Sequence, residues 1–414
     1  MGGPMLKKVL FKSIFSGVVF LTLSCTKSGF IDPYPPPPVT YISHQYKDKL
    51  TTAQIINRIS TYIPNAGSLF QPKYDVSVYR VFYKTHDYEN KEITASGLIY
   101  IPELNYYFLP VISYQHGTAI RKSEVSSMTG DLDYYVPFLF AGETGAIICE
   151  TDGIGLGFSE GVQHYFEPTD EANAVVDLLR SVERLLQKTF RNINLSRELF
   201  LMGYSQGGHA TLAAQRLLET NYPYEFILKA SAPMAGFFSF EKSTQFNVLK
   251  APVAYPVSGI YPFLLHSINT TQRVYPAFDS IFIPPYDSLV KVVFDGEHDA
   301  SFINAQFPDT IYNALQPSFI NALENQPNTP FLEAAKKYDI INDWIPKTPT
   351  RFYHSEGDEI AFYNNSEIAF QTFKTKGGNV QLYSLGNLNH LDANIAAIQQ
   401  VRSWFYPLVK ITGY

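Results

Sequence analysis

A serine flanked by glycines lies near the middle of this 414-residue chain. A short apolar run, Leu199 to Gly203, leads into Gly203-Tyr204-Ser205-Gln206-Gly207, a G-x-S-x-G pattern, and an Ala-rich stretch follows. Between a strand and a helix, the glycines allow a sharp turn that projects the serine hydroxyl at a helix N-terminus, where the dipole favours developing negative charge. The pattern predicts that Ser205 is a nucleophile. The alternative is a glycine-rich helix start that serves only packing.

A serine nucleophile needs a base, and the expected chain order is serine, carboxylate, histidine. His390 lies in a polar loop between the last predicted strand and a C-terminal helix, Ala393 to Phe405, which is where such folds place the base. We predict His390 as the base, with a structural loop histidine as the alternative. His209 lies four residues after Ser205 on the same predicted helix, so it points away from the hydroxyl and is expected to serve packing.

The carboxylate is expected after a late strand. Asp358 follows the strand-like segment Arg351 to His354, about thirty residues before His390, and is the predicted acid. Asp299 competes with it, because Val290 to Phe294 is also strand-like.

Further carboxylates are weaker candidates. Glu356 and Glu359 flank Asp358 in the same loop. A second acidic segment, 295–299, contains one histidine and could suggest a metal site, but such a loop is more typical of solvated surface. We predict no metal and no cofactor.

An oxyanion hole requires two backbone N–H groups near the nucleophile. The apolar strand Leu109 to Tyr114 ends in Gln115-His116-Gly117-Thr118. The backbone N–H groups of Thr118 and Gln206 are the predicted donors, and His116 is expected to shape the loop.

Apolar runs and amphipathic stretches alternate along the chain, which is typical of an α/β fold with a mostly parallel sheet and helices on both faces. The stretch Glu171 to Leu186 has the period of an amphipathic helix. An antiparallel hairpin, Val76 to Tyr83 with Ala95 to Ile101, is expected at one edge of the sheet. Residues 236–344 lack this alternation and are predicted to form an inserted cap. The remaining predicted strands are Leu109 to Tyr114, Ala146 to Glu150, Leu199 to Gly203, Lys229 to Pro233, Thr350 to His354 and Val380 to Ser384.

Composition agrees with one large globular domain. Apolar residues make up 45% of the chain and charged residues 17%, which excludes extensive disorder. The net charge is −6 and no block of like charge occurs, so no nucleic-acid partner is expected.

The N-terminus has the features of an export signal. Lys7 and Lys8 precede an apolar run, Ser13 to Leu23, which is too short to span a bilayer. The segment Leu21-Thr22-Leu23-Ser24-Cys25 resembles a bacterial lipobox, which implies lipidation of Cys25 and a membrane-anchored lipoprotein of a Gram-negative bacterium, in the outer membrane or periplasm. A plain cleaved signal with secretion and a cytosolic protein with an apolar N-terminus are the alternatives. The proline run 33–38 indicates an extended spacer.

These features divide the chain into a signal or lipobox-like segment, 1–25, a Pro-rich linker, 26–45, and a folded domain, 46–414, with a cap at about 236–344.

Four segments carry a resemblance to a known family: His116-Gly117-Thr118, Asp152 to Gly157 with His164-Tyr165, Gly203 to Ala210, and Ser231 to Gly236. In these segments the chain resembles the α/β-hydrolase superfamily, and within it the secretory lipase family. The resemblance covers about residues 70 to 406, and Gly153 and Tyr165 depart from the usual family pattern, which has an aromatic residue and a proline there. It implies ester hydrolysis by Ser205, Asp358 and His390, with a lid-like insertion before the acid.

The sequence therefore predicts a serine carboxylic ester hydrolase, a lipase or esterase that forms an acyl-enzyme on a small-molecule or lipid ester. A serine peptidase of the same fold and a catalytically inactive surface binding protein are the alternatives.

Overall fold

The computed structural model describes residues 1–2, 37–129, 135–190, 192–326 and 328–413. The architecture below belongs to the compact unit formed by residues 37–414. The lipobox-like segment with Cys25 and most of the proline run lie outside the described residues.

The central strands are apolar on both faces because helices cover both sides of the sheet. In the strand that leads to Ser205, Phe200 and Met202 pack in one hydrophobic cluster, and Leu199 and Leu201 pack in another on the opposite face. This alternation follows from the two-residue period of a strand.

The sheet has the strand order β1-β2-β3-β5-β4-β6-β7-β8-β9, and β10 pairs with β4. The six neighbouring strands from β5 to β9 in this order are parallel, whereas β1, β2, β3 and β10 pair antiparallel. The predicted α/β fold with a mostly parallel sheet is confirmed. The strands are β1 Tyr41–Leu50, β2 Val76–His86, β3 Glu92–Pro102, β4 Tyr107–Gln115, β5 Ile147–Thr151, β6 Ile193–Tyr204, β7 Ile227–Met234, β8 Thr350–His354, β9 Val380–Ser384 and β10 Thr412–Gly413.

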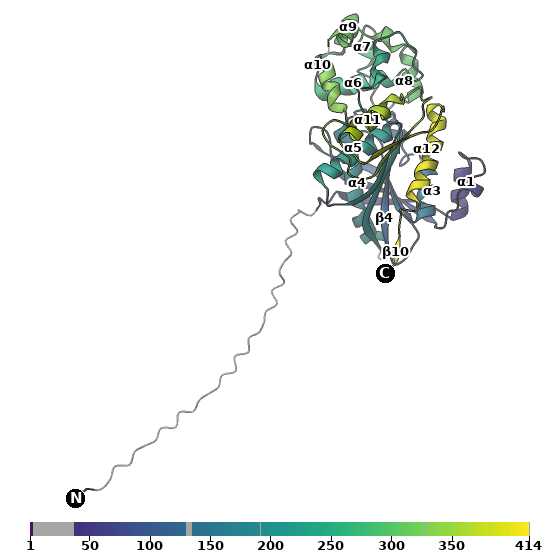
Figure 1. Cartoon of the computed structure of the whole chain (residues 1–414), viewed down its shortest axis with the longest axis vertical. Coiled ribbons are helices and arrows are strands. Elements are labelled where there is room, and N and C mark those ends of the chain that lie inside the picture. The colour runs from purple at the N-terminus through teal and green to yellow at the C-terminus, as the bar shows by residue number, and fades with distance from the viewer. Residues whose placement is uncertain (3–36, 130–134, 191, 327, 414) are drawn as a thin grey trace. The chain divides into compact units, whose positions relative to one another are not determined.

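Helices lie on both faces of the sheet (Figure 1). One face packs against α4 and α5, with α11 beside α5, and the other packs against α1, α3 and α12. The α-helices are α1 Thr52–Ser60, α2 Ala66–Leu69, α3 Tyr135–Thr144, α4 Pro168–Thr189, α5 Gln206–Asn221, α6 Ile260–Gln272, α7 Tyr286–Leu289, α8 Ala300–Gln306, α9 Pro317–Asn325, α10 Pro330–Ala335, α11 Asn364–Thr375 and α12 His390–Phe405. Short 3₁₀ turns are Lys122–Glu124, Thr244–Leu249, Phe278–Ser280, Ile311–Ala314 and Lys336–Tyr338.

The hairpin of β2 and β3 pairs antiparallel as predicted, but its predicted place at the sheet edge is wrong. The edge is β1, which pairs with β2 and begins at Tyr41, inside the predicted linker 26–45. Most side chains of β1 are exposed or half-buried, so this strand carries no apolar alternation that the sequence could reveal.

The chain between β7 and β8 forms a helical cap on the sheet (Figure 1). Helices α6 to α10 share one hydrophobic cluster with the segments that join them. Val290 to Phe294, which the sequence suggests as a strand, follows α7 as turns instead. Its apolar side chains, Val290, Val293 and Phe294, are buried in this cluster, so the apolar run reflects packing in the cap and not a strand.

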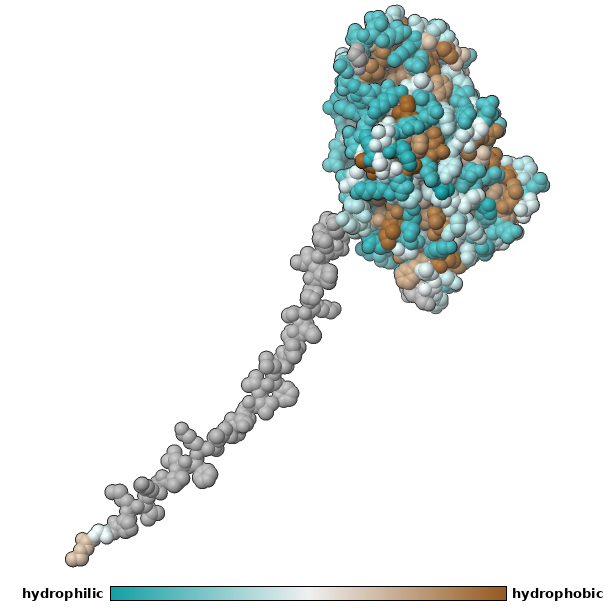
Figure 2. Space-filling view, viewed as in Figure 1, coloured by the Kyte–Doolittle hydropathy of each residue, from teal (hydrophilic) through white to brown (hydrophobic). Residues whose placement is uncertain are grey.

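Polar side chains cover much of the face drawn in Figure 2, with apolar side chains between them. The described part of the chain contains no helix with the length and hydropathy of a transmembrane span.

Candidate active site

Ser205 occupies a strained turn between β6 and α5. Its backbone has φ 59° and ψ −121°, a conformation that L-residues rarely adopt, and its amide donates to the Met234 carbonyl oxygen at 2.9 Å. The turn is close-packed: a Cβ on Gly203 would lie 2.3 Å from the Gly207 carbonyl oxygen, and one on Gly208 would lie 2.3 Å from that of Met234. The glycines around Ser205 are therefore required by the close approach of neighbouring backbone.

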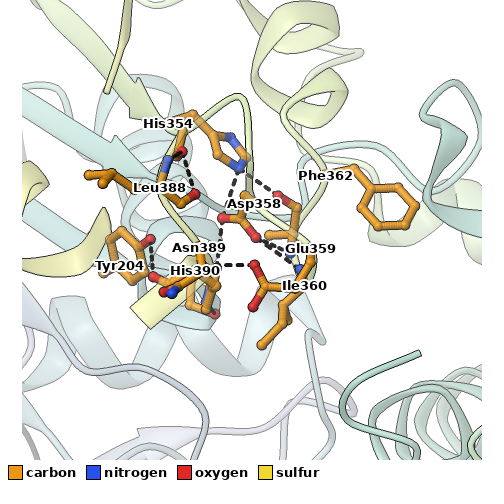
Figure 3. Close-up of polar contacts among 12 residues, drawn as sticks. Tyr204, His354, Asp358, Glu359, Ile360, Phe362, Leu388, Asn389 and His390 are labelled. Atoms are coloured by element: carbon orange, nitrogen blue, oxygen red, sulfur yellow. Dashed lines mark hydrogen bonds and ion pairs between the residues drawn. The ribbon is translucent and has the colours of Figure 1, made fainter. Parts of the chain in front are cut away.

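His390 is the first residue of α12, and its ring reaches Ser205. Nε2 lies 3.0 Å from the Ser205 hydroxyl oxygen, and Nδ1 lies 2.7 Å from Asp358 Oδ2. The His390 backbone is held from both sides, since its amide donates to Glu359 at 3.0 Å and its carbonyl accepts from the Tyr204 hydroxyl at 2.7 Å (Figure 3). The imidazole is thus fixed between a hydroxyl and a carboxylate.

Asp358 is the acceptor at the centre of this network, and it follows β8. Its Oδ1 accepts the amides of Ile360 at 3.0 Å and Ala361 at 2.8 Å, while Oδ2 faces His390. Burial by itself would raise the pKa of Asp358, but hydrogen bonds from His354 and His390 outweigh it and lower the pKa to about 2. Asp358 is therefore ionised at neutral pH, so His390 carries its proton on Nδ1 and, when neutral, presents Nε2 as an acceptor to the serine.

The loops that carry the acid and the base are tied to each other. The Ser355 hydroxyl accepts the amide of Leu388 at 2.8 Å and lies 2.6 Å from the Leu388 carbonyl oxygen. A Cβ on Gly357 would lie 2.5 Å from Asn387 Oδ1. This packing sets the distance between Asp358 and His390.

The loop after β4 lies against the first turn of α5. A Cβ on Gly207 would lie 2.0 Å from the Gln115 carbonyl oxygen and 2.6 Å from that of His116. His116 Nε2 lies 3.2 Å from the Asp152 carbonyl oxygen, and the Thr118 hydroxyl lies 2.8 Å from the Tyr165 hydroxyl. The predicted oxyanion loop and the turn of Ser205 are therefore adjacent.

The amides of Thr118 and Gln206 are the predicted oxyanion donors. Within the described ranges, neither of them donates a hydrogen bond to another protein group.

Other candidates from the sequence lie outside this network. His209 is buried, with Nδ1 2.5 Å from Glu171 Oε2 and Nε2 3.3 Å from the Tyr338 carbonyl oxygen, so it makes structural contacts. Asp299 caps α8 by accepting the Phe302 amide at 2.8 Å and does not contact His390. In the part of the chain that the structure describes, no group of three or more His, Cys, Asp or Glu side chains is arranged to hold a metal ion.

The sequence does not predict three contacts of the site (Figure 3). His354 contacts Asp358, whereas Tyr204 and Glu359 each contact the backbone of His390. The sequence suggests Glu359 only as a weak candidate for the acid. The four-residue spacing of His354 and Asp358 across a strand end is a sequence signal that could have suggested a contact.

Comparisons with known proteins identify the family of the chain. The family model described as "Secretory lipase" matches residues 141–406. The chain therefore belongs to the secretory lipase family, and it is a hydrolase of the lipase or esterase type with an α/β-hydrolase fold.

Two solved structures illustrate the similarity. The rice cell wall degrading esterase LipA from Xanthomonas oryzae is 26% identical, with a TM-score of 0.78 over 91% of this chain and 100% of that chain. Candida antarctica lipase A is 17% identical, with a TM-score of 0.65 over 86% of this chain and 78% of that chain, and shares the fold. No curated protein matches the chain.

Proposed function

We propose that the chain hydrolyses carboxylic esters through an acyl-enzyme on Ser205, with His390 as general base and acid and Asp358 as the group that orients it. The hydrogen-bonded series from the Ser205 hydroxyl through His390 to Asp358 carries this proposal. It combines a nucleophile, a base and an ionised carboxylate in the order that serine hydrolases require.

The first half of the reaction forms the acyl-enzyme. The Ser205 oxygen attacks the ester carbonyl carbon while its proton passes to His390 Nε2, and the imidazolium is stabilised by Asp358. His390 then gives this proton to the leaving alcohol as the C–O bond breaks. In the second half, water attacks the acyl carbon while its proton passes to His390 Nε2. His390 then gives this proton to the Ser205 oxygen as the bond between that oxygen and the acyl carbon breaks, which releases the carboxylic acid and restores the Ser205 hydroxyl.

The tetrahedral oxyanion would be stabilised by the backbone N–H groups of Thr118 and Gln206. Two features support this assignment: the loop of Thr118 packs on the first turn of α5, and both amides are free of protein acceptors within the described ranges. Gln206 also begins α5, so the helix dipole adds to the stabilisation.

The substrate is a small-molecule or lipid ester. Beside the site, buried aromatic side chains of the segment between β5 and α4 stack on those of the cap, such as Tyr165 on Phe263 with ring centroids 4.7 Å apart and Phe166 on Phe237 at 5.0 Å. The esterase from Xanthomonas oryzae, whose printed name describes cell wall degradation, suggests polysaccharide-linked acyl groups as one class to include among the substrates.

Turnover of p-nitrophenyl esters from acetyl to palmitoyl tests the proposal, with the wild type compared against Ser205→Ala. Serine-dependent turnover is expected, and the preferred chain length separates a lipase from a short-chain esterase. Full activity in Ser205→Ala would contradict the assignment of Ser205 as the nucleophile. Turnover of anilides in preference to esters would favour a peptidase.

We also propose that the protein is exported and anchored to a membrane through a lipid on Cys25. The name of the family points to secretion, and the lipobox-like segment before Cys25 supports the anchor.

A further inference from the structure

A second histidine faces Asp358 from the side opposite His390. His354, the last residue of β8, is fully buried, and its Nε2 lies 3.3 Å from Asp358 Oδ2. The same Nε2 lies 2.6 Å from the Ala361 carbonyl oxygen. The mechanism above assigns no role to this residue.

The neighbours of His354 fix the position of its proton. Both groups facing Nε2 are acceptors, a carbonyl oxygen and an ionised carboxylate, so Nε2 must carry a hydrogen. Nδ1 lies 2.7 Å from the Ser366 hydroxyl of α11, which can donate to it. His354 therefore presents an N–H group toward the loop of Asp358.

This N–H closes a ring of contacts around the carboxylate. Ala361 accepts from His354 through its carbonyl oxygen and donates to Asp358 Oδ1 through its amide. Oδ1 receives two backbone amides, and Oδ2 lies between two imidazoles. With donors on both oxygens, rotation of the carboxylate away from His390 would leave buried groups unpaired, which is costly.

We propose that His354 is a positioning residue that holds the Asp358 carboxylate against His390, a role that rests on the function proposed for Ser205, Asp358 and His390. It acts through Asp358 and does not touch the substrate. Its effect should appear in kcat, because the orientation of His390 matters most when charge develops on the imidazole.

Two variants of similar polarity distinguish the contribution of the Nε2 N–H group from that of the rest of the His354 side chain. The amide of Gln in His354→Gln can reach the position of Nε2, whereas the shorter side chain of His354→Asn reaches only that of Nδ1, near Ser366. We expect His354→Gln to keep kcat within about threefold of the wild type. His354→Asn should lower kcat about 10- to 100-fold with KM nearly unchanged, since small misplacements of catalytic groups have effects of this size.

A double-mutant cycle with Asp358→Asn distinguishes positioning from a purely structural role. When the Asp358 charge is absent, adding His354→Asn should change kcat by no more than about twofold. Equal losses in both backgrounds would overturn the proposal, as would full kcat in His354→Asn or an equal loss in His354→Gln. If Ser205→Ala kept the activity, the proposed function itself would fail, whatever His354 does.

A measurement on the wild type covers the case in which the variants do not fold. NMR of the chain labelled with ¹⁵N-histidine reports which ring nitrogen of His354 carries the proton. Protonation of Nε2 is expected, and a neutral ring protonated only at Nδ1 would overturn the proposal.

Discussion

Asp358 is buried and nevertheless ionised, because its two oxygens accept from two backbone amides and lie near two imidazoles. Its pKa is about 2, against a usual value of 3.8. A carboxyl whose pKa is lowered on folding stabilises the folded state above its unfolded pKa, and this stabilisation is lost as the pH falls through the folded pKa. The stabilisation from Asp358 is therefore lost between about pH 4 and pH 2.

We predict that the stability advantage of the wild type over Asp358→Asn shrinks by about 2 kcal/mol between about pH 6 and pH 2. Urea unfolding at both pH values measures it. Asp309→Asn, at an exposed carboxyl, is the control. An advantage that does not change with pH would contradict the lowered pKa of Asp358.

Ser205 makes the opposite contribution to stability, since its backbone conformation is unfavourable for a residue with a side chain. Only glycine adopts φ 59° and ψ −121° readily. We predict that Ser205→Gly unfolds with a free energy about 1 kcal/mol higher than Ser205→Ala, because both lack the hydroxyl and only one relieves the strain. Thermal or denaturant unfolding of the two variants gives the difference. Equal stability would show that the turn stores no strain at this position.

At the scale of elements, the site depends on how closely the loop after β4 approaches α5. Gly207 has no room for a side chain, because a Cβ would lie 2.0 Å from the Gln115 carbonyl oxygen. In Gly207→Ala the loop and the helix must separate, which should cost about 1–3 kcal/mol of stability. It should also misplace the Thr118 amide and lower kcat about 10²- to 10³-fold, as the loss of an oxyanion donor does.

The control for Gly207→Ala is Gly67→Ala in α2, where the new Cβ would make an ordinary 3.5 Å contact with Ile56. Esterase assays and unfolding curves of the two variants, taken together, test the role of the loop. If Gly207→Ala is destabilised but keeps its kcat, the loop does not supply an oxyanion donor.

The elements also show how far the sequence predicts this fold. The central strands can be predicted from the sequence because both of their faces are buried, so each strand is a continuous apolar run. The same rule fails in two opposite cases. β1 is an exposed edge with no such run, and Val290 to Phe294 is an apolar run buried in the cap without being a strand.

The site residues follow a similar division. Ser205, Asp358 and His390 could be selected from chain order and from their places after predicted strands, and the structure brings them within hydrogen-bonding distance. His354 could not be assigned in this way. The four-residue spacing of His354 and Asp358 suggests a contact, but the path of the turn after β8 decides whether the two side chains meet.

For the whole molecule, the lipid anchor proposed for Cys25 predicts where the folded unit 37–414 is found in the cell. The lipobox-like segment ends at Cys25, and β1 begins at Tyr41. The number of intervening residues sets an upper limit of about 50 Å on the distance between Cys25 and the start of β1. A lipid on Cys25 would contribute about 0.8 kcal/mol per buried CH₂ group, so two or more chains would anchor the protein stably.

We predict that the wild-type chain fractionates with membranes and incorporates a labelled fatty acid, whereas Cys25→Ala does neither and becomes soluble after export. Cys149→Ala is the matched control, because it removes the other cysteine of the chain, a buried thiol in β5 that a lipidating enzyme cannot reach. Both variants should keep serine-dependent ester hydrolysis, which shows that the folded unit is intact. Retention of Cys25→Ala in the membrane fraction would contradict the lipid anchor and indicate that the apolar N-terminal run or the folded unit itself binds the membrane.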